Sequence, residues 1–291
     1  MVRATYIPRT PHRLLVARLK QMRQEHGLTP ADLAAQSKIN PTQLSRLESL
    51  TRPPVASQVL ALCHFYKLDE RTTAELMALA EPVRGDHDGW SRFDLETMTA
   101  RYLTFESDSK GVLTYQSMLI PGLLQEESYA TAVVNSLRSY LSDEQITETV
   151  ASRMERRRNL LPPRSLKFHA IIDEAVLLRR LGGKQGMRRQ LEHLLEATQL
   201  PNVIVQILPI SSGPHPGLNG SFSIFTFGQD LLGDFAYVED QIGQTFEDRD
   251  DIVALCKSNF SALATLAATP NESTTMIEQR LSWLESDGTE G

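Results

Sequence analysis

Residues 28–48 read LTPADLAAQSKINPTQLSRLE, and this stretch decides the fold of the N-terminal part of the chain. It begins with a hydroxyl residue, a proline and an acid at Thr29, Pro30 and Asp32, which is a typical start of a helix. Asn40, followed by a proline and then by a glutamine, starts a second helix in the same way. We therefore expect two short helices joined by a tight turn, the arrangement that a helix-turn-helix requires.

The second predicted helix has an apolar face and a polar face. Leu44 and Leu47 point together into a core when successive residues turn by about 100°. The opposite side carries short polar and cationic side chains, as a helix that enters the major groove of DNA should. These outward residues are Thr42, Ser45, Arg46 and Ser49, with Gln43 on the flank. The N-terminus of this helix is expected to offer N–H groups to a phosphate. A plain helical bundle with polar exposed faces would show the same pattern.

Three more helices are expected around this pair, because apolar residues recur there at helical spacing. They are predicted over residues 11–26, 56–66 and 70–80. Residues 81–89 mix Pro, Gly and charge without periodicity, and a linker is predicted over residues 83–90. We thus expect an all-α five-helix DNA-binding domain over residues 1–82 and a regulatory or dimerisation domain over residues 91–291.

The second domain alternates helical and strand-like segments. Helices are predicted at about residues 91–106, 126–139, 143–160, 173–180, 184–198, 248–268 and 272–285. Strands, rich in β-branched and aromatic residues, are predicted over residues 112–116, 166–172, 203–208, 222–227 and 235–238. This domain is therefore expected to be a mixed α+β domain with one sheet, and its strand order stays open.

Charge is unevenly divided along the 291 residues, which together carry a net charge of −6. Residues 1–52 hold nine Lys or Arg against three acids, a net charge of +6, so the remaining 239 residues carry −6 − 6 = −12. A basic head on an acidic body is expected when only the head meets an anion such as DNA.

Composition argues against several other classes of protein. No stretch approaches 18 uncharged apolar residues, and the first ten residues carry no apolar signal region, so we expect neither a membrane span nor a signal peptide. Cys63 and Cys256 lie in apolar helical patterns and are expected to be buried thiols in a reducing cytoplasm. Because no GxSxG, HExxH or Cys–His pattern occurs, we expect no catalytic residues, metal or cofactor.

Three polar segments have simpler interpretations than a catalytic or phosphate site. Residues 182–186 lack the spacing of a phosphate-binding loop and are interpreted as glycines that end a helix. Asp173 and Glu174 diverge by about 100° on a helix, which does not suit a paired-carboxylate site. The arginines of residues 153–158 are interpreted as a solvated helix face, with contact to DNA or a partner as the alternative.

Residues 28–48 also resemble the λ-repressor-like, XRE-type helix-turn-helix, through LTxxxLA followed by IxxxxLSRLE. The resemblance implies that Thr42, Gln43 and Arg46 read base edges. The full set of candidate DNA-binding residues is Thr42, Gln43, Ser45 and Arg46, with Thr29, Lys38 and Arg52 as phosphate contacts. Pro30 departs from the family, which commonly has a backbone-contacting Gln there, and Pro41 stands where many members have a polar residue.

The rest of the chain resembles the WhiJ-like regulators of actinomycetes. Trp90, Tyr102 and Tyr115 precede IPGLLQEESYA at residues 120–130, as in that family's signature. Further matches follow in the family's order at RMERR (153–157), IIDEAVL (171–177), LPNVIVQILP (200–209) and HPGL (215–218). The resemblance covers about residues 13–285 and implies a transcriptional regulator whose gene commonly lies beside one for a small partner protein. The biochemical activity of that family's C-terminal domain is undefined.

Two segments are candidates for the surface that receives a regulatory signal. The loop of residues 211–220, rich in Gly and Pro, carries His215 and Asn219 and is either a ligand or partner contact or a long hairpin connection. The motif around Pro121, Leu124 and Tyr129 is expected to complete this surface, because it holds apolar and aromatic groups beside backbone donors. From the resemblance, a small protein partner is expected at least as readily as a metabolite.

The sequence thus predicts a cytoplasmic, sequence-specific transcriptional regulator that binds double-stranded DNA as a homodimer on a near-palindrome. The dimer contact is expected in the last two helices, through Ile252, Leu255, Leu263, Leu266, Ile277, Leu281 and Leu284. One alternative is an antitoxin-like interaction protein that sequesters a small partner protein and autoregulates its operon. Another is a sensor or enzyme domain that acts on a small molecule.

Overall fold

The computed structural model describes residues 8–80, 97–137, 141–228, 233–239 and 244–286. Side chains are described throughout these ranges except for residues 97–101. By contact the chain divides into two compact units, of which the first contains helices α1 to α6 and the second contains all the strands and helices α7 to α12. The predicted linker at residues 83–90 lies outside the described residues.

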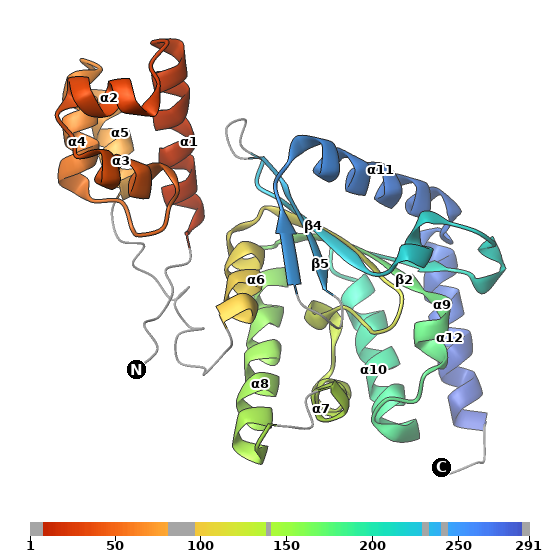
Figure 1. Cartoon of the computed structure of the whole chain (residues 1–291). Helices are drawn as coiled ribbons and strands as arrows, with labels where there is room; N and C mark the ends of the chain where they lie inside the picture. Colours follow the sequence, from red (N-terminus) through yellow and green to blue (C-terminus); the bar gives the residue numbers. More distant parts are fainter. Residues whose placement is uncertain (1–7, 81–96, 138–140, 229–232, 240–243, 287–291) are drawn as a thin grey trace. The chain divides into compact units, whose positions relative to one another are not determined.

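The first unit contains the five short helices that the sequence predicts. They are α1 (Thr10–Glu25), α2 (Pro30–Ser37), α3 (Pro41–Glu48), α4 (Ala56–Phe65) and α5 (Glu70–Ala80), labelled in Figure 1. Their inward side chains form one core, which includes Leu15, Leu33, Leu44, Leu62 and Leu76. The all-α N-terminal domain is therefore confirmed. Helix α6 (Thr97–Asp108) follows; residues 91–96 of the predicted sixth helix lie outside the described residues.

The second unit is built on one mixed sheet, as expected. Its strands are β1 (Gly111–Gln116), β2 (Lys167–Asp173), β3 (Val203–Leu208), β4 (Phe222–Thr226), β5 (Phe235–Glu239) and β6 (Gln244–Glu247). In the described residues the strand order is β3-β2-β1-β4-β5-β6, with β1, β2 and β3 parallel and the other neighbours antiparallel. The sequence did not predict β6, because QTFE contains only one apolar residue and so shows neither an apolar run nor alternation.

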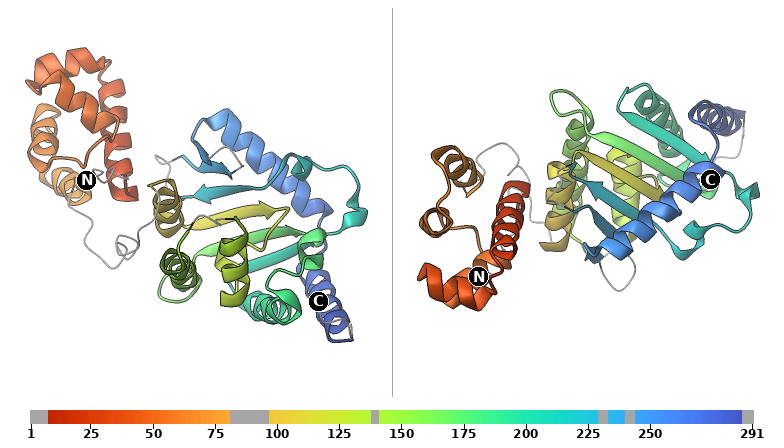
Figure 2. Two further views of the ribbon diagram at one scale, coloured as in Figure 1. Left: turned by 60° about the horizontal axis from the view of Figure 1, so that its bottom comes forward. Right: turned by 90° about the horizontal axis from the view of Figure 1, so that it is seen from above.

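Helices cover both faces of this sheet. They are α7 (Glu127–Leu137), α8 (Asp143–Arg156), α9 (Glu174–Leu178), α10 (Gly183–Thr198), α11 (Asp250–Leu266) and α12 (Pro270–Ser286). Figures 1 and 2 show α11 along one face, with α7 and α10 against the other. On the α11 face, Tyr115, Ile171 and Ile224 pack against Phe260 and Leu263 in one apolar cluster. The carboxyl ends of β1, β2 and β3 meet at one edge, where α9 follows β2 directly.

None of the helices in the described ranges is, by itself, long and apolar enough to cross a membrane. Helices α11 and α12 meet the same test only when taken together, across a bend of 67°.

Candidate nucleic-acid interface

A capping box closes the N-terminus of α2. Thr29 Oγ1 accepts a hydrogen bond from the Asp32 N–H at 3.2 Å, and the Asp32 carboxylate accepts one from the Thr29 N–H at 3.0 Å. The Thr29 hydroxyl also donates to this carboxylate at 2.6 Å. The two bonds that the carboxylate accepts, first that from the hydroxyl and then that from the N–H, lower the pKa of Asp32. The hydroxyl that was expected at a phosphate is thus engaged within the cap, although Thr29 remains exposed.

The turn from α2 to α3 is fixed by three successive residues. Lys38 adopts the left-handed conformation, with φ of 58°, and reverses the chain. Ile39 is buried and anchors the turn on the core. Asn40 then caps α3, because its side-chain oxygen accepts the Thr42 N–H at 2.9 Å while its carbonyl accepts the Gln43 N–H at the same distance.

This cap corrects one expectation about phosphate binding. Pro41 has no N–H, and the next two N–H groups of α3, those of Thr42 and Gln43, are both bonded to Asn40. The first turn of α3 therefore presents no free N–H group to a phosphate, and the exposed side chains of the helix must make the contacts.

The exposed face of α3 contains the residues that the sequence predicted. Leu44 and Leu47 are buried, with 1% and 3% of their surface exposed, and fix the helix on the core. The residues pointing outward are Thr42, Gln43, Ser45 and Arg46. Lys38 and Arg52, one before α3 and one after it, are also exposed. Among the described residues, Arg46, Lys38 and Arg52 take part in no ion pair, so their charges remain available to an external anion.

An ion pair that the sequence did not predict holds α3 in place. Arg23, in the last turn of α1, donates from Nε to the Glu48 carboxylate at 2.8 Å and from Nη1 to the Leu28 carbonyl at 2.9 Å. Glu48 is the last residue of α3, so Arg23 connects α1 to both ends of the motif. The two residues are 25 positions apart, and neither helical spacing nor local charge pairing indicates such a partner.

The two segments of the second unit that were predicted to receive a regulatory signal differ in exposure: one is partly exposed and the other is buried. Asn219 is exposed and His215 is half-buried, in and beside the short helical turn Pro216–Asn219. Leu124 and Tyr129 have no exposed surface, and Pro121 is also buried. The expectation that these three offer groups on a surface is thereby corrected, since they form part of the core.

Tyr129 has a structural role. Its hydroxyl accepts a hydrogen bond from the Ile120 N–H at 3.1 Å, and burial raises its pKa to about 12. Around it, Gln125 donates to the Ile120 carbonyl at 2.8 Å, and Gln190 on α10 donates to the Leu124 carbonyl at 2.7 Å. The PGLLQ motif is therefore a buried, hydrogen-bonded segment of the fold.

His215 packs edge-on against Tyr115 at the carboxyl edge of the parallel strands, with ring centroids 6.1 Å apart. The Tyr115 hydroxyl donates to Asp173 at 3.3 Å, and burial together with this carboxylate raises the pKa of Tyr115. His215 Nδ1 is shielded from solvent and has no hydrogen-bond partner in the described part of the chain.

The arginines of residues 153–158 are more engaged than expected. Arg156 is buried against Gly122, and Arg153 donates to Gln125 Oε1 at 3.0 Å. Their side chains reach the buried PGLLQ segment, so the interpretation as a wholly solvated face is wrong for these two. Gly182 and Gly183, interpreted as glycines that end a helix, instead begin α10 with φ of 77° and 72°.

Neither cysteine belongs to a metal site in the described residues. Cys63 is buried and Cys256 is half-buried, both as free thiols. No group of three or more His, Cys, Asp or Glu is placed to hold a metal in the same part of the chain.

The predicted dimer residues on α11 and α12 differ in exposure. Leu263, Ile277 and Leu284 are buried within their own unit, so they are not available to a second copy. Leu255 and Leu266 are exposed, at 56% and 43%.

Two domain families match the chain. A helix-turn-helix domain matches residues 14–76, which span α2 and α3. A domain of unknown function, DUF5753, matches residues 99–279, more than half of the chain. No curated protein and no solved structure matched.

Proposed function

This chain belongs to the family of proteins that carry the DUF5753 domain, and we propose that it is a sequence-specific DNA-binding transcriptional regulator of the WhiJ-like kind. The observation that carries the proposal is the exposed face of α3, where Arg46 takes part in no ion pair among the described residues. An arginine at such a position donates two parallel hydrogen bonds to the O6 and N7 atoms of guanine. Gln43 is suited in the same way to adenine.

Two of the remaining candidates contact the DNA backbone in this proposal, and the others have different roles. Lys38 and Arg52 lie on either side of α3 and are exposed, so they are placed to meet phosphates next to the groove that α3 enters. Thr42 and Ser45 are short enough to let the helix approach the base edges. Thr29 contributes through the cap that orients α2.

In this proposal the protein acts in the cytoplasm. It acts as a homodimer, because one short recognition helix reads only a few base pairs. Two copies on a near-palindrome would place equivalent half-sites about 34 Å apart, or a multiple of that distance. The exposed Leu255 and Leu266 on α11 support a dimer contact there. The second unit adds control, through a small protein partner or a ligand, and the loop with His215 and Asn219 is one part of the surface that receives it.

The test is selection of genomic DNA fragments by the purified full-length chain at a fixed salt concentration. The proposal predicts recovery of a short, near-palindromic motif that binds at least about 1,000-fold more tightly than random DNA. Recovery of fragments without a common motif, bound no more tightly than random DNA, would contradict sequence-specific binding.

A further inference from the structure

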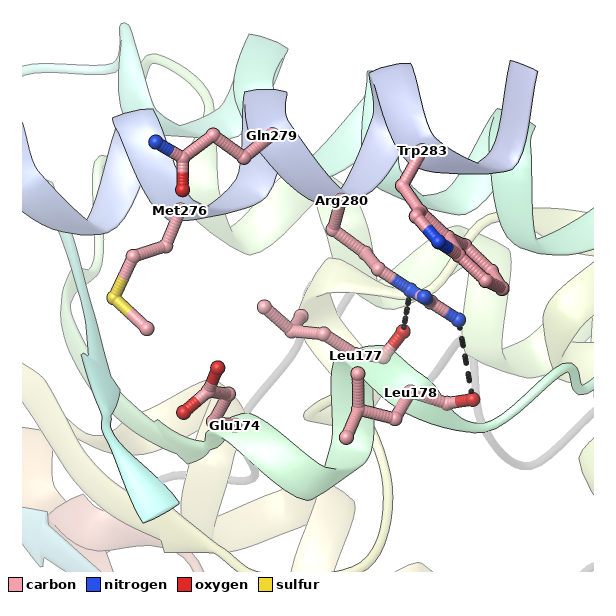
Figure 3. A pocket seen from close by; sticks show the side chains of 7 residues that line it. All are labelled: Glu174, Leu177, Leu178, Met276, Gln279, Arg280 and Trp283. Carbon is pink, nitrogen blue, oxygen red and sulfur yellow. Dashed lines mark hydrogen bonds between the residues drawn. The ribbon is translucent and has the colours of Figure 1, made fainter. Parts of the chain in front are cut away.

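Helices α9 and α12 enclose a shallow groove on the surface of the second unit (Figure 3). Leu177 and Leu178 of α9 and Met276 of α12 supply its apolar lining. Glu174 lies near Met276 at one end, and Arg280 and Trp283 lie at the other. The volume of the groove is about 220 Å³. Pockets that enclose a small-molecule ligand usually measure about 300–1,000 Å³, so this groove suits one or two side chains of a larger partner.

The end of the groove at Trp283 is held rigid by arginine. Arg280 donates to the carbonyls of Leu177 and Leu178, at 2.9 and 3.3 Å, where α9 ends. Its guanidinium also lies over the Trp283 ring, 4.0 Å from the ring centre, and that of Arg180 lies 5.2 Å from the same centre. Trp283 is nevertheless 45% exposed. A tryptophan and arginines fixed in advance are the side chains most often found to dominate binding at protein interfaces.

Further exposed apolar side chains surround α9. Leu178, Met118 and Ile210 are 48%, 54% and 60% exposed. Met118 is linked to the C-terminal end of α9 because Arg179 approaches its sulfur at 3.8 Å. Ile210 is linked to the N-terminal end because its N–H donates to Glu174 at 2.9 Å. With Trp283, four large exposed apolar groups gather around a helix of five residues, whereas single exposed apolar residues are ordinary.

The charge at this place is opposite to that of its surroundings. Residues 109–291 hold 16 Lys or Arg against 23 acids, a net charge of −7, yet α9 is followed directly by Arg179 and Arg180, and Arg280 lies across the groove. The cationic groups lie at the end of the groove beside Trp283, whereas Glu174 lies at the opposite end. At the Trp283 end, the arginines attract acidic side chains of a partner and repel basic ones. DNA is excluded as the occupant by the apolar lining, because protein–DNA interfaces are strongly polar.

We propose that the groove between α9 and α12 is a docking site for a segment of a partner protein in which large apolar side chains are flanked by Asp or Glu. One apolar side chain fills the groove beside Leu177 and Met276, and the acidic groups meet Arg179 and Arg180. This inference deepens the proposed regulatory function, and it rests on that function only for its effect on DNA binding.

The test uses random 15-residue peptides displayed on phage, selected in parallel on the full-length chain and on its Trp283→Ala variant. Peptides enriched on the unaltered chain alone should combine Asp or Glu with Leu, Ile, Phe or Trp. Synthetic copies should bind at least tenfold more weakly to Trp283→Ala and to Arg180→Glu. Leu137→Ala is the control, because it removes an exposed apolar side chain from α7, outside the groove, and it should leave peptide binding unchanged. Thermal unfolding of every variant should remain as cooperative as that of the unaltered chain, which shows that weaker binding does not come from loss of the fold.

A charge exchange makes the test specific. A peptide with Lys in place of its acidic residues should bind Arg180→Glu more tightly than it binds the unaltered chain. Enrichment of the same peptides on both chains, or enrichment of basic peptides, would overturn the proposal. A dimer of the unaltered chain that becomes a monomer in Trp283→Ala would also overturn it, by assigning the groove to a second copy.

DNA binding distinguishes failure of this inference from failure of the proposed function. Trp283→Ala should bind the selected DNA with the same affinity as the unaltered chain when no peptide is present. If the chain binds DNA sequence-specifically but no peptide binds in the groove, only the docking site is contradicted. If peptides bind in the groove but the chain binds no DNA sequence-specifically, only the proposed function is contradicted.

Discussion

Arg23 and Glu48 form an ion pair that is largely withdrawn from water and that joins the last turn of α1 to the last residue of α3. Each side chain is only 13% exposed, and a second contact between Nη2 and Oε2 at 3.5 Å accompanies the one from Nε. Helix α3 has only eight residues, too few to be stable alone, so its orientation depends on such contacts with the rest of the unit.

The first prediction concerns this ion pair. Arg23→Ala should lower the free energy of unfolding of the first unit by about 3 kcal/mol, because Glu48 is left as an uncompensated, mostly buried charge. Replacing both residues, as Arg23→Met with Glu48→Leu, should recover most of that loss. Urea unfolding followed by circular dichroism measures both effects. A double variant no more stable than Arg23→Ala would show that the pair acts in another way.

The first unit could be predicted from the sequence almost completely, because its signals are local. Caps at Thr29 and Asn40 and a break at Gly27 mark the helix ends, and each acts within a few residues. The exposed face of α3 followed from the positions of Leu44 and Leu47 alone.

The second unit was harder to predict because its determinants act over long distances. Strand order depends on pairing such as that of Tyr115 with Phe222, more than 100 residues away in sequence. Burial of Leu124 and Tyr129 depends on α10, so a motif with apolar, aromatic and backbone groups was interpreted as a surface. The groove at Trp283 lies between α9 and α12, which are about 100 residues apart, so no local sequence pattern indicates it.

The second prediction concerns the loop that carries His215. A Cβ atom at Gly217 would lie 2.5 Å from ring carbons of Tyr115, so Gly217→Ala forces the loop or the ring to move. We expect the second unit to lose about 1–3 kcal/mol of stability. Leu218→Ala is the matched control, since Leu218 is 72% exposed and its loss should change stability by less than about 0.5 kcal/mol. Equal effects in chemical denaturation would argue against the close contact.

The third prediction is a pH dependence that originates at His169. Burial lowers the pKa of His169, whose Nε2 is paired with Gln206 at 2.7 Å. The neutral ring therefore contributes stability that is complete above the unfolded pKa of about 6.5 and is lost as pH falls through the lowered folded value. Stability of the second unit should therefore fall as pH drops below about 6.5, and it should fall less steeply in His169→Asn. His193, whose pKa is also lowered by burial, leaves a residual slope in that variant. If the free energy of unfolding changes with pH equally steeply in both chains, His169 is excluded as a source of the pH dependence.

The fourth prediction concerns oligomeric state. Leu255→Glu with Leu266→Glu should convert a full-length dimer into a monomer, because both side chains are exposed on α11 and would bring like charges together. Light scattering gives the mass, and DNA titration should show weaker binding. Ala262→Glu, on the same helix, tests whether the surface extends between them. A dimer that survives all three changes would place the contact elsewhere.

Base reading by α3 is tested by comparing the binding of Arg46→Ala and of the unaltered chain to selected DNA and to random DNA. If Arg46 reads base edges, Arg46→Ala should lose about 1–3 kcal/mol of binding free energy on the selected DNA and little on random DNA. Arg71→Ala is the matched control, since it removes the same charge from an exposed arginine on α5, outside the recognition helix. Equal losses on both DNAs for Arg46→Ala would assign its side chain to the phosphate backbone and contradict base reading by this residue of α3.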